Sequence, residues 1–106
     1  MTQFPKSFDD LLRAADKPIL VDFWAPWCGP CRAVSHAVQQ IAREYAGRMT
    51  TIKVNVDEKP HLAGRYQISS IPTIMLFWQG QPIMRIQGAH PAEQIRRQIE
   101  AHWPAS

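Results

Sequence analysis

The chain has two cysteines, Cys28 and Cys31, and both lie in the run Trp-Cys-Gly-Pro-Cys at residues 27–31. A disulfide scaffold or an all-cysteine metal site needs more than one pair of thiols, so neither class fits. The apolar residues 19–24 precede the run and have the composition of a strand, and a helical pattern follows it. A C-x-x-C pair between a strand and a helix is typical of a reactive dithiol, whereas two small buried hydrophobes are the alternative. The spacing therefore predicts redox chemistry.

The two cysteines are expected to have different roles. Cys28 should lie at the N-terminus of the helix, where free backbone N–H groups and the helix dipole stabilise a thiolate that solvent can reach. A thiolate attacks a disulfide and forms a mixed disulfide, which a second thiol resolves. Cys31 follows about one helical turn deeper, within reach of the first sulfur. We therefore expect Cys28 to attack and Cys31 to resolve.

Asp22 interrupts the apolar strand six residues before Cys28. A carboxyl group buried there would lose its hydration, so its pKa should rise and it should exchange a proton near neutral pH. Asp22 is therefore a candidate general base for Cys31. The alternative is an aspartate at the end of a strand that faces water.

Residues 21–32, Val-Asp-Phe-Trp-Ala-Pro-Trp-Cys-Gly-Pro-Cys-Arg, resemble the active-site signature of the thioredoxin family almost residue for residue. The Ile-Pro-Thr of residues 71–73, Asp57 and Gly88 fall where that family carries its other marks. The similarity runs from about Ser7 to the C-terminus. It implies an α/β thioredoxin fold, a mixed central sheet with helices on both faces.

The resemblance also implies residues that tune the redox pair. Gly29 and Pro30 match the reductant branch of the family, whereas histidine in this dipeptide is typical of the isomerase and oxidant branches. Lys53 would lie beside Asp22 and partly offset its buried charge. Asp22 would act as the base for Cys31, the role that residue reasoning gives it.

A surface for substrates is implied in the same way. The bond before Pro72 would be cis and would leave the preceding backbone free to pair with an extended substrate strand. Without the resemblance, Pro72 reads as an ordinary turn proline. The implied flat apolar surface around the dithiol comprises Trp27, Ile71, Pro72 and Gly88.

The implied activity is protein-disulfide reduction without a bound cofactor. The redox group would be the Cys28–Cys31 disulfide, and electrons would come from NADPH through a flavin-dependent thioredoxin reductase. The partners would be that reductase and disulfide-containing client proteins, with no nucleic acid and no membrane, and the chain would be a monomer. Two alternatives remain open: an exported oxidant or isomerase, and a specialised assembly factor. No metal is expected, because no histidine lies at finger-like spacing from the cysteines.

Length and composition fit this interpretation. A chain of 106 residues makes one domain, taken as residues 1–106, and 45% apolar with 20% charged residues is typical of a folded protein. The net charge of +3 is scattered, and the basic pair at residues 96–97 suits a solvated helix face better than a nucleic-acid patch. No apolar run is long enough to span a membrane, and the first residues lack the features of a secretory signal. If Met1 is the native start, we expect a cytoplasmic protein.

Periodicity and capping signals predict the elements that position these residues. The continuous apolar character of one strand, at residues 19–24, suits a central place in the sheet. That strand and the next should be parallel across a helical crossover, and the last two should form an antiparallel hairpin. The predicted helices are 7–15, 28–45, 60–66 and 91–102, and the predicted strands are 19–24, 51–56, 73–78 and 82–87.

Two features depart from the family. Six residues precede Ser7 and one of them is Pro5, so the family's N-terminal strand should be short or missing. His36 stands where the family usually has a proline that kinks the active-site helix, and histidine restores a backbone donor, so we expect a straighter helix. His36 lies roughly 12 Å along the helix axis from Cys28. An exposed or structural histidine is therefore favoured over a base for the thiols.

Overall fold

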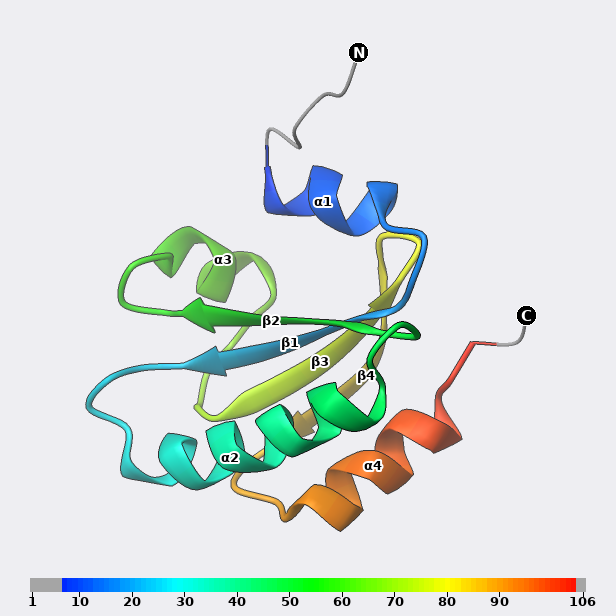
Figure 1. The fold of residues 1–106 in the computed structure, drawn as a ribbon. Helices are drawn as coiled ribbons and strands as arrows, with labels where there is room; N and C mark the ends of the chain where they lie inside the picture. Colours follow the sequence, from blue (N-terminus) through cyan, green and yellow to red (C-terminus); the bar gives the residue numbers. More distant parts are fainter. Residues whose placement is uncertain (1–6, 105–106) are drawn as a thin grey trace.

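The computed structural model describes residues 7–104, which contain four strands and four helices (Figure 1). The N-terminal strand that we expected to be short or missing falls before Ser7 and lies outside the described residues. The elements in chain order are α1 (Phe8–Ala14), β1 (Ile19–Trp24), α2 (Gly29–Glu44), β2 (Thr50–Asn55), α3 (Pro60–Arg65), β3 (Thr73–Trp78), β4 (Gln81–Gln87) and α4 (Ala92–Ala101).

The strands form a mixed sheet in the order β2-β1-β3-β4. β1 is parallel to β2 and antiparallel to β3, and β3 and β4 form an antiparallel hairpin. The hairpin turns through Gln79 and Gly80, whose positive φ angles of 53° and 83° suit a tight turn between twisted strands. This arrangement confirms the predicted α/β class, the central place of β1, the parallel pair and the hairpin.

The predicted element positions are confirmed within one residue at each end, and β2 shows why small offsets remain. The alternation of polar and apolar residues predicted a strand at 51–56, whereas the strand begins and ends one residue earlier. Thr50 already pairs with Ile19 of β1, and Asn55 pairs with Trp24 at the other end. The strand ends where the ladder with β1 ends, which alternation within β2 does not reveal.

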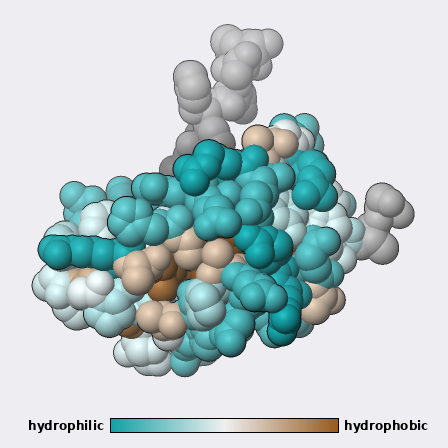
Figure 2. Space-filling view, turned by 60° about the horizontal axis from the view of Figure 1, so that its bottom comes forward, coloured by the Kyte–Doolittle hydropathy of each residue, from teal (hydrophilic) through white to brown (hydrophobic). Residues whose placement is uncertain are grey.

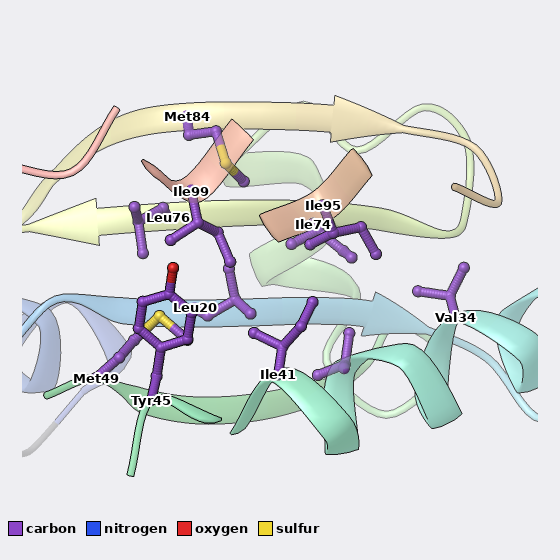
Figure 3. Packing of buried hydrophobic residues seen from close by; sticks show 11 residues of the cluster. Leu20, Val34, Ile41, Tyr45, Met49, Ile74, Leu76, Met84, Ile95 and Ile99 are labelled. Carbon is purple, nitrogen blue, oxygen red and sulfur yellow. The ribbon is translucent and has the colours of Figure 1, made fainter. Parts of the chain in front are cut away.

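Helices cover both faces of the sheet, as predicted (Figure 1). α2 and α4 pack on one face, where Leu20 of β1 belongs to a buried cluster that also includes Tyr45 and Ile99 (Figure 3). α1 and α3 pack on the other face, against Val21 and Phe23. Because side chains alternate along a strand, Asp22 points to the same face as Leu20, toward α2. The two-residue alternation of side chains along β1 therefore places the Asp22 carboxyl group on the side of the sheet that α2 covers.

α2 runs without a break from Gly29 to Glu44. His36 is exposed on it, which confirms an exposed histidine, while the straightness of the helix stays a prediction. Tyr45 is the C-cap of the helix, and Gly47 follows with a φ of 85°, a conformation that glycine adopts without strain. Within residues 7–104, no helix combines the length and the apolar character needed to cross a membrane.

Candidate active site

The two cysteines lie at the start of α2, after the short loop that follows β1. The loop between β1 and α2 forms a turn that is closed by a hydrogen bond from Cys28 N to Ala25 O, 3.1 Å long. Cys28 is the N-cap of α2 in extended conformation, and its Sγ accepts a hydrogen bond from Cys31 N at 3.2 Å. The cysteines form a disulfide, with their Cα atoms 5.3 Å apart. The predicted position of Cys28 at a helix N-terminus is confirmed.

Gly29 and Pro30 occupy the first turn of α2. Proline suits this turn, because the backbone N–H groups of the first turn have no carbonyl partner within the helix, and proline lacks this N–H. Gly29 is exposed, and a Cβ added to it would meet no atom within 4 Å. The structure therefore leaves room for a side chain at Gly29.

The disulfide itself is less accessible than we expected. Cys28 is 5% exposed and Cys31 is 2% exposed, so both are buried, and Cys28 is the more accessible by a small margin. They pack with Ala25 and with the half-buried side chains of Trp24 and Ile71. A substrate must therefore contact the surrounding surface closely to reach Cys28.

Asp22 is fully buried, as predicted, and so does not face water. Neither carboxylate oxygen has a hydrogen-bond partner within the described part of the chain. Loss of hydration raises the pKa of Asp22 to about 6, and the positive charge of Lys53 opposes this rise. Asp22 points from β1 toward α2, and Cys31 is one of the residues that α2 buries. The carboxyl group can therefore exchange a proton near neutral pH inside the layer that holds Cys31.

Lys53 lies opposite Asp22 in the parallel register of β1 and β2. Its ammonium does not pair with the carboxylate; instead Nζ donates a hydrogen bond to Ser35 Oγ at 2.7 Å. Nζ also lies 4.7 Å from the centre of the Trp24 ring, a cation–π distance. Sequence reasoning missed Ser35, although it follows Cys31 by four residues and so lies on the same face of α2.

The loop before β3 carries the second half of the site. The Ile71–Pro72 bond is cis, as the family resemblance implied. Pro72 O accepts a hydrogen bond from Gly88 N at 2.9 Å, which joins this loop to the end of β4. Thr73 is buried, and its Oγ1 donates to Ser70 O at 2.6 Å. Gly88 has a φ of 96°, where a side chain would strain the backbone.

Trp27 is the one large apolar side chain that the described part of the chain exposes, at 70%. Its Nε1 donates to the Asp57 carboxylate, 3.0 Å from Oδ2 and 3.3 Å from Oδ1. Asp57 is held in turn by a hydrogen bond from its backbone N to Asn55 Oδ1 at 2.9 Å. The indole is therefore fixed at its polar edge while most of its surface stays in solvent.

A cavity of about 260 Å³ lies beside Trp27, between the Ile71 loop and α3. The predicted contact residues Trp27 and Ile71 meet in its lining, whereas Pro72 and Gly88 meet each other through their hydrogen bond. The apolar part of the lining also includes residues that sequence reasoning missed: Val56, Pro60, Ala63 and Ile68. Such a partly apolar hollow suits an apolar side chain of a bound chain.

The surface on the side of α2 and α4 is mostly hydrophilic, and its apolar residues gather mainly in one region, with a few isolated ones elsewhere (Figure 2). No three histidine, cysteine, aspartate or glutamate side chains within residues 7–104 lie close enough together to hold a metal ion.

Comparison with known proteins identifies the family to which the chain belongs. A family model described as Thioredoxin matches residues 1–101. Thioredoxin 1 of Chlorobaculum tepidum is 46% identical over 94 residues, 89% of this chain and 93% of the relative. Thioredoxin 1 of a Nostoc species is 49% identical over 88 residues, 83% of this chain and 82% of the relative. Thioredoxin of a Synechocystis species is 43% identical over 96 residues, 91% of this chain and 90% of the relative. The chain therefore belongs to the thioredoxin family and is a thioredoxin-type protein-disulfide oxidoreductase whose redox-active group is the Cys28–Cys31 pair.

Proposed function

We propose that Cys28 attacks the disulfides of client proteins and that Cys31 resolves the mixed disulfide. The observation that carries this assignment is the N-cap position of Cys28, whose Sγ accepts the N–H of Cys31. In the reduced protein the same N–H group and the helix dipole stabilise a Cys28 thiolate. Cys31 lies inside the first turn of α2 and is buried more deeply.

The first step forms one S–S bond and breaks another. The Cys28 thiolate attacks one sulfur of the client disulfide, and the other client sulfur leaves as a thiolate. The product is a mixed disulfide between Cys28 and the client. A thiolate at a helix N-terminus is also a good leaving group, which the second step requires.

The second step requires Cys31 to lose its proton. We assign that proton to the Asp22 carboxylate, whose pKa of about 6 lets it accept a proton near neutral pH. The Cys31 thiolate then attacks the Cys28 sulfur and releases the second client thiolate. The two electrons of the dithiol have then passed to the client, and the Cys28–Cys31 disulfide is restored.

Client recognition is assigned to Trp27, Ile71, Pro72 and Gly88. No backbone hydrogen bond within residues 7–104 uses the N–H or C=O of Ile71. An extended client segment can therefore pair with Ile71 as an added strand beside Cys28. The cavity beside Trp27 offers a place for one of its apolar side chains.

Gly29, Pro30 and Lys53 are assigned to tuning the redox pair. Gly29 and Pro30 set the first turn of α2 around the Cys28 sulfur, and Lys53 places a positive charge near Asp22. We propose that these three residues tune the dithiol for the reduction of client disulfides.

We propose an NADPH-dependent thioredoxin reductase as the electron source and disulfide-containing proteins as clients. A dithiol reductant works in a reducing compartment, so we place the protein in the cytoplasm. We propose that it acts as a monomer and binds neither nucleic acid nor a membrane.

Insulin reduction coupled to NADPH and a thioredoxin reductase tests the proposal. Wild type should consume NADPH, and Cys28→Ser should abolish turnover. Cys31→Ser should attack once and remain joined to the client as a mixed disulfide. Trapping by Cys28→Ser would reverse the assignment. Absence of wild-type turnover would favour an assembly factor, and faster oxidation of client dithiols than reduction of client disulfides would favour an exported oxidant or isomerase.

A further inference from the structure

The ammonium group of Lys53 has a defined position on the α2 side of the sheet. Its Nζ is 2.7 Å from Ser35 Oγ and 4.7 Å from the centre of the Trp24 ring. Ser35 belongs to α2 and Trp24 ends β1, so the contacts come from both layers. An exposed lysine otherwise samples many rotamers, and each contact restricts that freedom. Ser35 and Trp24 together therefore fix where this positive charge lies.

Asp22 is the acid on which this charge acts. It lies opposite Lys53 in the β1–β2 register, fully buried and with neither oxygen hydrogen-bonded within the described residues. No ion pair joins the two side chains within that part of the chain. The interaction therefore depends on where the ammonium is held.

Few other titratable groups share this environment. The β3 partner of Asp22 is Ile74, which carries no charge. Of the side chains that α2 buries, Cys31 is the titratable one, and it is held in the disulfide. Arg32 and His36 of α2 are exposed, and α4 buries Ile95 and Ile99.

We propose that Ser35 is a positioning residue for the resolving step: its hydroxyl anchors the Lys53 ammonium above Trp24, and the anchored charge sets how readily Asp22 accepts a proton. The inference rests on the proposed role of Asp22 as the base for Cys31. Without the anchor, the ammonium moves into water, because entry into the buried site would cost it hydration. Its attraction for the Asp22 carboxylate then weakens, and Asp22 holds its proton more tightly.

NMR titration of the Asp22 carboxyl carbon tests the anchor in the oxidised full chain, where the cysteines do not titrate. Ser35→Ala should raise the measured pKa by about 0.3–0.5 units, the size expected for weakening one exposed charge interaction. Ser35→Thr keeps the hydroxyl and should restore the wild-type value. Lys53→Met removes the charge and should give a larger rise.

The double variant separates anchoring from a general disturbance of α2. Ser35→Ala should have no effect on the Asp22 titration in a Lys53→Met background. An unchanged or lower pKa in Ser35→Ala would overturn the proposal, and so would an equal rise in both backgrounds. Alanine favours helix more than serine does, so the variant should remain folded.

A kinetic measurement links the anchor to the reaction. The reduced protein is mixed with an aromatic disulfide that releases one coloured thiol when Cys28 attacks and a second when Cys31 resolves. The midpoint of the pH profile of the second release should rise in Ser35→Ala by the shift that NMR records. If the titration shifts and this profile does not, the base role of Asp22 fails and Ser35 serves no step of resolution. If the titration does not shift, the anchor alone fails, and Asp22→Asn tests the base role separately.

Discussion

Replacing Asp22 with asparagine should stabilise the protein at neutral pH. The carboxyl group has a pKa of about 6 in the folded state against an ordinary value of 3.8, because burial disfavours its charged form. The folded state therefore binds the proton more tightly, and stability is lost as pH rises from about 3.8 to about 6. A difference of about two pKa units corresponds to about 3 kcal/mol. Asparagine keeps the shape and has no charge to bury.

Denaturant unfolding at pH 3.5 and pH 7.5 measures the effect. The free energy of unfolding of Asp22→Asn minus that of the wild type should grow by about 3 kcal/mol between the two pH values. Groups that titrate equally in both proteins cancel in this difference. Asp16→Asn makes the same change at an exposed position and serves as the matched control. An equal difference in unfolding free energy at both pH values would refute the claim that the Asp22 carboxyl group is buried and ionised at pH 7.5. The same variant should slow resolution by Cys31.

Three further predictions concern the surroundings of the site. Gly88→Ala should destabilise the protein by about 1–2 kcal/mol, because the backbone at this position has a positive φ. The control Gly64→Ala lies in a helix with open space around it and should not destabilise the protein. Equal unfolding midpoints for the two variants would contradict the prediction. His36→Pro should cost up to about 3 kcal/mol in a straight helix, and a gain in stability would show that α2 keeps the family's bend. His36→Ala should leave the pH dependence of Cys28 alkylation unchanged, and a shift approaching about one unit would show that His36 tunes the dithiol.

Local sequence patterns are enough to identify the segments that form the fold and the position of the reactive pair. Periods of two and 3.6 residues mark the strands and helices, and caps such as Ser7 act within a few residues. The position of Cys28 follows from its place between β1 and α2. Burial of Asp22 follows from a charged residue inside a continuous apolar strand. These features depend on interactions between residues close in sequence, so the order of neighbouring residues is enough to predict them.

Which distant groups meet depends on the packing of the whole chain. Trp27 is fixed by Asp57, 30 residues away in sequence, and Lys53 is held by Ser35, 18 residues away. The cis bond before Pro72 followed from the family resemblance, since the residues alone read as an ordinary turn. Contacts of this kind depend on the register between strands and on how a helix packs across the sheet. Neither is encoded in the spacing of any one segment, so the sequence locates the chemistry and the packing of the layers sets its surroundings.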